Sequence, residues 1–206
     1  MSKKYYLLII ALVFLIIGFF WLFKKDNYQI KNYPSSGTEI IAFGDSLVEG
    51  VGSTVGNDFV SLLSKKTGRE IMNLGISGNT TEDGLKRIGE IEKYNPKVVM
   101  ILLGGNDAIR RIKTETTFKN LELIIQKVHS TGAVVLLLGV KGGLLGDKFK
   151  PEFKEISQKY RTAFVPNVLD GLFGNPKFMS DGIHPNDEGY KIIAEKVYPV
   201  LISVLR

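Results

Sequence analysis

The sequence of 206 residues contains no cysteine and only two histidines. The lack of cysteine excludes disulfide frameworks, cysteine-ligated zinc, iron–sulfur clusters and thiol nucleophiles. It also excludes a lipid-modified N-terminal cysteine. A mechanism that needs an imidazole base can draw only on His129 or His184. These absences narrow the possible chemistry before any motif is considered.

Basic residues are never concentrated in one place. The formal net charge is +6, from 27 Lys and Arg against 21 Asp and Glu, and no basic run is longer than two residues. This pattern argues against a dedicated nucleic-acid surface. The composition, with 44% hydrophobic and 23% charged residues, excludes a disordered or fibrous chain. The length fits a single domain.

One long hydrophobic run stands at the start of the chain. Residues 5–23 carry no charge, and as a helix they would be about 28 Å long, close to the roughly 30 Å core of a bilayer. The run is longer than the apolar part of a cleaved signal peptide and is not followed by small residues. We therefore predict a membrane anchor, or an uncleaved signal, over residues 1–23. Lysines flank the run on both sides, namely Lys3, Lys4, Lys24 and Lys25.

The remainder of the chain is expected to lie outside the membrane. Residues 24–37 are polar and are interpreted as a tether, and residues 38–206 as the folded domain. The lysines on the two flanks are nearly balanced, so the positive-inside rule decides little. By analogy with signal anchors, we expect the domain on the extracytoplasmic, or periplasmic, side.

Apolar, β-prone runs alternate with helical patterns along the domain. Because several of the apolar runs are continuous, both faces of the sheet are expected to be buried, as in parallel sheets. The predicted fold is α/β, a three-layer α/β/α domain with a flavodoxin-like, five-stranded parallel sheet. Strands are predicted at Glu39–Phe43, Ile71–Leu74, Val98–Leu103, Val134–Leu138 and Thr162–Val165. Helices are predicted at Asp58–Thr67, Glu82–Tyr94, Thr114–Ser130, Pro151–Tyr160 and from Asn186 onward, with Pro199 kinking or interrupting the last.

The loops after the first three predicted strands are rich in glycine and polar residues. They comprise residues 44–47, 75–79 and 104–107. In a parallel sheet these loops meet at one edge, where ligands bind. None contains the Gly-Lys-Ser/Thr ending of a phosphate-binding loop, and Gly50-Val51-Gly52 lacks the third glycine of a dinucleotide fingerprint. The fold alone leaves a flavodoxin-like cofactor domain open.

A metal site is a weaker possibility near the C-terminus. His184 and Asp187 are three residues apart, and Asp181 is close to them in the sequence. Pro185 interrupts the local backbone, however, and no second histidine lies in this region. We therefore disfavour metal-dependent hydrolysis.

Serine-based nucleophilic catalysis fits the pattern best. Ser46 directly follows a predicted strand, and Asp181 precedes His184 by three residues on a loop. That spacing lets the carboxylate contact Nδ1 of the imidazole while Nε2 faces the serine. Ser77 also follows a strand and is a rival nucleophile, whereas His129 is expected to be structural at a helix C-terminus.

Four sequence blocks resemble those of a known enzyme family. The blocks are Gly44–Leu47, Asn73–Gly78, Gly104–Asp107 and Asp181–Pro185. Their order and spacing resemble the conserved blocks of the SGNH hydrolases, also called GDSL esterases or lipases. The sequence is most similar to the branch of acyl-thioesterases, lysophospholipases and arylesterases. The resemblance extends over roughly residues 39–205.

The resemblance implies a role for each conserved polar residue. Ser46 would be the nucleophile, His184 the base and then the acid, and Asp181 the residue that orients His184. The oxyanion would be bound by the backbone N–H groups of Ser46 and Gly75 and by the side-chain amide of Asn106. Neither a metal nor an organic cofactor is required.

Other residues near these blocks receive supporting roles. Asp45 is expected to accept hydrogen bonds from nearby backbone N–H groups, and Asp107 to hold its own loop in shape. Apolar residues that could bind the substrate are Leu47, Ile76, Ile109 and Ile183.

The leading functional hypothesis is a membrane-anchored serine esterase that forms an acyl-enzyme. Its substrate would be a carboxylic ester or thioester, such as a lysophospholipid, an aryl ester or a short or medium acyl ester. The alternatives are an O-acetyl esterase of cell-envelope glycans and a catalytically silent binding module. Residues 139–146 read GVKGGLLG where relatives often carry a Pro-Pro-Asn-Tyr-Gly-like loop, so the family's substrates do not transfer in detail.

Overall fold

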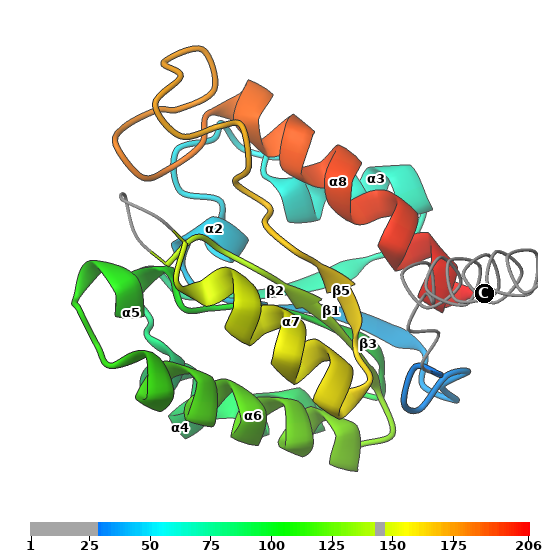
Figure 1. Cartoon of the computed structure of the whole chain (residues 1–206). Helices are drawn as coiled ribbons and strands as arrows, with labels where there is room; N and C mark the ends of the chain where they lie inside the picture. The colour runs from blue at the N-terminus through cyan, green and yellow to red at the C-terminus, as the bar shows by residue number, and fades with distance from the viewer. Residues whose placement is uncertain (1–28, 143–146) are drawn as a thin grey trace, which may run out of the picture.

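The computed structural model describes residues 29–142 and 147–206. Five strands form one parallel sheet in the order β2-β1-β3-β4-β5 (Figure 1). This arrangement confirms the predicted five-stranded parallel sheet, and the observed boundaries lie within two residues of the predicted ones. The strands are β1 (Glu39–Gly44), β2 (Ile71–Gly75), β3 (Pro96–Leu102), β4 (Val134–Leu138) and β5 (Ala163–Val165).

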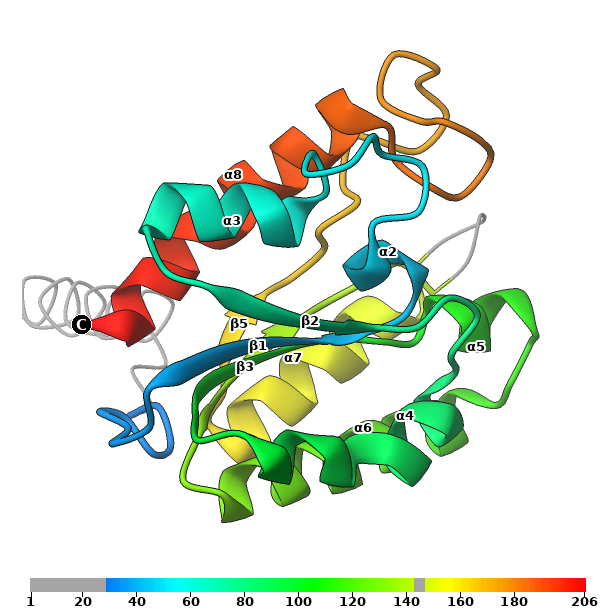
Figure 2. The same cartoon turned by 180° about the vertical axis from the view of Figure 1, so that it is seen from behind.

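Helices cover both faces of the sheet and complete the three layers. α3 and α8 lie on one face, and α4, α6 and α7 lie on the other (Figures 1 and 2). The short helices α2 and α5 were not predicted, because four or five residues are too few to show helical periodicity. The helices are α2 (Ser46–Glu49), α3 (Phe59–Thr67), α4 (Thr81–Arg87), α5 (Gly105–Ile109), α6 (Thr114–Ser130), α7 (Phe149–Tyr160) and α8 (Asp187–Leu205).

Two helix predictions need correction. The helix expected over Glu82–Tyr94 consists of α4 followed by the 3₁₀-helix η1 (Ile88–Lys93). Gly89 has a low helical propensity, and 3₁₀ turns commonly end a helix. Pro199 does not interrupt α8, which continues to Leu205. The buried face of α8 packs on both sides of Pro199, and this packing outweighs one missing backbone hydrogen bond.

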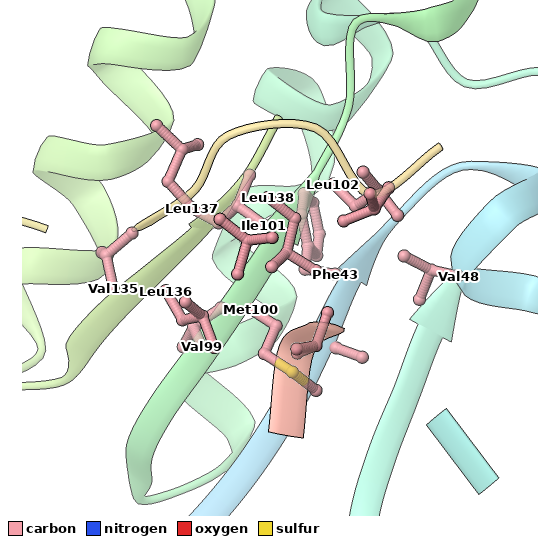
Figure 3. Packing of buried hydrophobic residues seen from close by; sticks show 14 of the residues in the cluster. Phe43, Val48, Val99, Met100, Ile101, Leu102, Val135, Leu136, Leu137 and Leu138 are labelled. Carbon is pink, nitrogen blue, oxygen red and sulfur yellow. The ribbon is translucent and has the colours of Figure 1, made fainter. Parts of the chain in front are cut away.

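The core is densest around the two central strands. Every residue of β4 is buried, and so is every residue of β3 except Lys97. Figure 3 shows these strands with Phe43 of β1, and Val48 of α2 beside them. Val48 is completely buried, so the short helix that carries Ser46 is fixed to the core.

The described part of the predicted tether is attached to the domain. The Asn32 side chain donates to the carbonyls of His129 and Ala133, at 2.9 Å each. Ser35 Oγ donates to the carbonyl of Gly132 at 2.9 Å. The segment from Lys31 to Ser35, called the strap below, is therefore bound at the amino ends of the strands. It is held there because its polar groups donate hydrogen bonds to backbone carbonyls.

The predicted anchor over residues 5–23 and residues 24–28 of the tether lie outside the described residues. Within residues 29–142 and 147–206, no helix is both long and apolar enough to span a membrane.

Candidate active site

Ser46 is held at the carboxyl end of β1 by a tight strand-to-helix turn. Gly44 ends the strand, where a Cβ atom would lie 2.3 Å from the carbonyl oxygen of Leu102. Asp45 caps α2, and its carboxylate accepts the N–H of Leu47 at 3.0 Å. Ser46 is the first residue of α2, and its backbone N–H has no acceptor among the described residues, as is usual in a first helical turn. Its side chain therefore stands beside an unpaired donor.

The loop between β5 and α8 brings Asp181 and His184 to this serine. The Asp181 Oδ2 atom lies 2.7 Å from His184 Nδ1, and His184 Nε2 lies 3.1 Å from Ser46 Oγ. Asp181 Oδ1 accepts the N–H groups of Ile183 and His184, both at 2.7 Å. The bond to His184 and these two amides lower the pKa of Asp181 to about 2. The predicted trio therefore meets in the order Asp–His–Ser.

The ionised carboxylate fixes the tautomer of the imidazole. A carboxylate only accepts hydrogen bonds, so Nδ1 of His184 carries the hydrogen. In the neutral ring, Nε2 is then an acceptor directed at the Ser46 hydroxyl. This is the geometry that a general base requires.

The segment after α2 supports the loop that carries His184. Gly52 has φ +96° and lies directly against that loop. A Cβ atom on Gly52 would lie 2.5 Å from the carbonyl oxygen of Pro185 and 3.1 Å from the Cβ of His184. A side chain at this position would displace the imidazole.

Two further contacts join the same segment to α8. The Tyr190 hydroxyl donates to the carbonyl of Val51 at 2.8 Å. The Asp187 carboxylate accepts the backbone N–H and the hydroxyl of Thr54, each at 2.7 Å, and these bonds lower its pKa. Asp187 is therefore used in tying two segments together and does not form a metal cluster with His184.

Asn106, at the start of α5, brings a side-chain amide to the site. Its Nδ2 donates to the carbonyl of Asn79 at 3.0 Å, which leaves the second N–H of the amide available. The residue lines the same cavity as Ser46 and His184. The structure thus brings Asn106 together with Ser46 and His184, and its role as an oxyanion donor stays a prediction.

Gly75, the predicted backbone donor, is not brought into the site. It is the last residue of β2, paired with Gly44, and its N–H donates to Asn73 Oδ1 at 2.9 Å. A Cβ atom there would lie 2.2 Å from the backbone nitrogen of Glu49, so Gly75 packs behind α2. The prediction fails because the strand continues one residue further than expected.

Gly78, which the sequence reasoning missed, has the unpaired N–H of this loop. It has φ +79°, and the carbonyl of its neighbour Asn79 holds the Asn106 amide. Among the described residues, the Gly78 N–H has no acceptor. The other N–H groups of residues 75–79 all donate: Gly75 to Asn73, Ile76 to Gly44, Ser77 to Glu49 and Asn79 to Ile76. The sequence block contains two glycines, and only the hydrogen bonds distinguish them.

Arg87 is a second residue that the sequence did not reveal. Its Nη2 donates to the carbonyl of Gly44 and its Nε to Asn79 Oδ1, both at 2.7 Å. The guanidinium also lies over the ring of Phe43, 4.1 Å from the centroid. Arg87 therefore ties the end of β1 to the residue that orients Asn106. At the end of a helix, an arginine is typical of a solvated face, so no pattern marked it.

The site opens into a cavity of about 810 Å³. Three of the four predicted substrate-binding residues, Leu47, Ile109 and Ile183, line it together with Phe173. Ile76 does not line it, although its side chain is exposed. Ile76 belongs to the turn that follows β2, where its N–H donates to the carbonyl of Gly44.

The two buried aspartates of the motif act as acceptors. The carboxylate of Asp107 accepts the N–H of Thr81 at 2.9 Å and bonds to the hydroxyls of Thr81 and Thr117, so it joins α5 to α4 and α6. Burial, with the charge of Asp107 nearby, raises the pKa of Asp45 to about 7. The expectation for Asp45 agrees with its bond to the N–H of Leu47. Asp107 instead binds residues of α4 and α6, so it joins separate elements rather than holding its own loop.

The rival candidates lie away from the reacting groups. Ser77 donates its N–H to Glu49 and does not line the cavity. His129 lies at the opposite edge of the sheet, where its carbonyl accepts Asn32. Ser46 is therefore the serine that the structure pairs with an imidazole.

Comparison with known proteins agrees with the sequence blocks. The chain matches the GDSL-like lipase/acylhydrolase family over residues 42–192. It is 32% identical over 178 residues to the esterase TesA of Pseudomonas aeruginosa, covering 81% of this chain and 89% of the relative. It is 28% identical over 165 residues to thioesterase 1/protease 1/lysophospholipase L1 of Escherichia coli, covering 76% and 79%.

The structural comparison leads to the same family. The crystal structure of the esterase EstA from Pseudoalteromonas sp., inhibited by monoethylphosphonate, superposes with a TM-score of 0.74. The two sequences are 26% identical, and the match covers 81% of this chain and 98% of that one. With the four blocks, the fold and these relatives in agreement, the chain belongs to the GDSL-like lipase/acylhydrolase family, the SGNH hydrolases, and is an ester-hydrolysing enzyme.

Proposed function

We propose that the protein hydrolyses carboxylic esters or thioesters through an acyl-enzyme formed on Ser46. The observation that carries this proposal is the continuous chain of hydrogen bonds from Asp181 through His184 to the Ser46 hydroxyl. A serine is a weak nucleophile until an adjacent base can accept its proton, and this chain supplies that base.

The reaction follows from the positions of these groups. Ser46 Oγ attacks the ester carbonyl as His184 Nε2 takes its proton, which gives a tetrahedral oxyanion. The intermediate collapses, and the leaving alcohol or thiol departs with the proton from His184. Water then attacks the acyl-enzyme in the same way and releases the acid. Asp181, with its pKa of about 2, stays ionised throughout and stabilises the imidazolium.

We assign three donors to the oxyanion. They are the N–H of Ser46, the second N–H of the Asn106 amide and, in place of Gly75, the N–H of Gly78. The assignment of Gly78 is supported by its unpaired N–H and by its place next to Asn79, which holds Asn106. Removing one such donor typically lowers kcat about 10²–10³-fold.

The substrate class is supported by the cavity and the relatives. Apolar side chains such as Leu47, Ile109 and Phe173 line a space large enough for an acyl chain or an aryl group. The relatives are named as an esterase and as a thioesterase and lysophospholipase. We therefore favour an amphiphilic or aryl ester over a purely polar one.

The location that we propose is the extracytoplasmic face of a membrane, with residues 5–23 as the anchor. The length of that uncharged run and its flanking lysines support an anchor. The chain enters the domain at the amino ends of the strands, where Asn32 and Ser35 are bound, whereas Ser46 lies at the carboxyl ends. The seven residues of β3 separate these edges by about 23 Å. In this arrangement the cavity opens away from the strap that follows the anchor.

A series of p-nitrophenyl esters from acetyl to palmitoyl tests the proposal. We expect the full chain to hydrolyse at least part of the series and the Ser46→Ala variant to lose that activity. A preference for acetyl would favour small-acyl or glycan O-acetyl substrates, and a medium or long preference would favour lysophospholipids. Folded protein that hydrolyses none of the esters would refute the proposal in favour of a binding module.

A further inference from the structure

Two cationic residues from separate segments of the chain line the cavity. Arg111 lies two residues after the end of α5, and Lys141 lies three residues after the end of β4. The single carboxylate among the described residues that line the cavity belongs to Asp45, which is buried beneath Ser46. The open part of the cavity therefore carries net positive charge.

Arg111 is held at the cavity in an unusual backbone conformation. Its φ is +56°, in the left-handed region that costs an L-residue free energy and is most often occupied by glycine. Its N–H donates to the carbonyl of Ala108 at 3.1 Å, and the next N–H, from Ile112, donates to the carbonyl of Asp107 at 2.9 Å. Asp107 is completely buried, so the turn is fixed to the core. Strained residues of this kind are concentrated at functional sites.

The neighbouring Arg110 makes different contacts from Arg111. Arg110 donates through Nη2 to the carbonyl of Gly78 at 2.8 Å and so supports the loop of residues 75–79. Arg111 lines the cavity instead and has no ion-pair partner anywhere in residues 29–142 and 147–206. Arg110 is thus bound within the structure, whereas Arg111 lines the cavity without an ion pair in the described part of the chain.

The position of Lys141 is set by the end of β4. Gly139 packs so closely on the carbonyl of Pro166 that a Cβ atom would lie 2.1 Å from its oxygen. Val140 is buried and lines the cavity, and Gly142 donates its N–H to Asp147 at 3.0 Å. Lys141 thus leaves the sheet between two fixed points, on the cavity side.

The geometry points to an ester substrate with an anionic group, a carboxylate or a phosphate, bound by Arg111 and assisted by Lys141. A guanidinium suits this task because its planar donors match two oxygens at once. The apolar side chains Ile109, Phe173 and Ile183 also line the cavity and are 57%, 37% and 44% exposed. The cavity therefore fits an amphiphilic anion. This inference rests on the proposed function and specifies its substrate class.

Two matched ester pairs test the inference with the full chain. The first is p-nitrophenyl hemisuberate against p-nitrophenyl octanoate, which places the anion on the acyl side. The second is 4-octanoyloxybenzoate against its methyl ester, which places the anion on the leaving group. We expect kcat/KM for the anionic member of at least one pair to be about fivefold or more above its neutral partner, and added salt to reduce this ratio.

Variants identify the residue responsible. Arg111→Gln and Arg111→Gly should each lower the anionic-to-neutral ratio about fivefold, mainly through KM. The glycine variant removes the charge while it fits the left-handed backbone, so misfolding cannot mimic the result. Arg111→Lys should restore part of the ratio. Lys113→Gln, an exposed cation two residues away that does not line the cavity, should leave it unchanged.

The outcomes separate this inference from the proposed function. Hydrolysis of the neutral esters without any anionic preference, or a preference that survives Arg111→Gly, would overturn the inference and leave the esterase intact. If the protein hydrolyses no member of either pair, the proposed esterase activity and the inference are both refuted.

Discussion

The two histidines of the chain lie at opposite edges of the same sheet and in opposite surroundings. His184, at the carboxyl edge, bonds through both ring nitrogens, to Asp181 and to Ser46. His129, near the amino edge, is buried, and neither of its ring nitrogens has a partner among the described residues. Burial, together with the charges of Lys31 and Arg161, lowers the pKa of His129 to about 4. The same side chain is thus a base in one region and a neutral core residue in the other.

The backbone groups near the two histidines also differ in how their hydrogen bonds are used. At the carboxyl edge, the N–H groups of Ser46 and Gly78 are left without acceptors in the described structure. At the amino edge, Asn32 and Ser35 bind carbonyls in the last turn of α6 and just after it. One edge keeps donors available for a ligand, while the other uses its polar groups to hold the strap that enters the domain.

The largest expected effect comes from replacing His184, and the matched replacement of His129 should have almost none. His184→Ala should lower kcat about 10⁴-fold or more, as Ser46→Ala should, and the double variant should be no worse because the groups act as a unit. His129→Leu, the matched change at the other edge, should leave kcat within about twofold. Ester hydrolysis by the purified variants measures this, and equal losses from the two histidine variants would contradict the assignment.

Asp181→Asn should have the next largest effect. The amide keeps the size of the side chain but cannot stabilise the imidazolium, and it can hold the ring in the wrong tautomer, so kcat should fall about 10³–10⁴-fold. Because the pKa of Asp181 is about 2, its protonation should not contribute to any loss of activity between pH 4 and pH 7. A decrease of less than tenfold in steady-state kinetics would show that His184 is oriented by other groups.

Arg87→Met should reduce kcat about tenfold with little change in KM. The variant keeps an apolar stem over Phe43 but loses the bonds to Gly44 and Asn79, so Asn106 is less well positioned for the oxyanion. Partial recovery of kcat in Arg87→Lys would support a positioning role. An unfolding curve at the same pH controls for stability, and a change in KM alone would argue against this role.

Gly52→Ala should lower kcat about tenfold by displacing the loop of His184, since the new Cβ would meet the Pro185 carbonyl. Gly56→Ala is its matched control, because Gly56 also has a positive φ but has only Lys65 Nζ within 4 Å. Both variants should lose about 1 kcal/mol of stability from backbone strain. Comparing kcat with the free energy of unfolding separates the two effects, and similar kcat values would contradict the prediction.

The smallest effect on activity, but a clear one on stability, is expected at His129. Its folded pKa of about 4 lies below its ordinary 6.5, so the unfolded chain takes up the proton first as the pH falls. This group should therefore lower the free energy of unfolding by about 3 kcal/mol between pH 7 and pH 4. Denaturant unfolding of His129→Leu should show a weaker pH dependence than the wild type over this range.

Much of the site could be predicted because its signals are local. Asp181 and His184 are three residues apart, and Ser46 directly follows an apolar strand, so short-range geometry already limits where their side chains can meet. Gly78 and Arg87 could not be found in this way. The first was recognised by which N–H groups lack acceptors, and the second by a contact with a carbonyl 43 residues away in the chain.

The sequence by itself determined the five parallel strands, the edge at which their polar loops meet and the three residues, Asp181, His184 and Ser46, that the structure joins by hydrogen bonds. These features follow from periodicity, from strand direction and from the scarcity of histidine. The tertiary structure alone decided which glycine of residues 75–79 has an unpaired N–H, the binding of the strap and the place of Arg111 in the cavity. Each of these depends on partners from distant segments, and a hydrogen bond or a close approach exists only when folding brings both sides together.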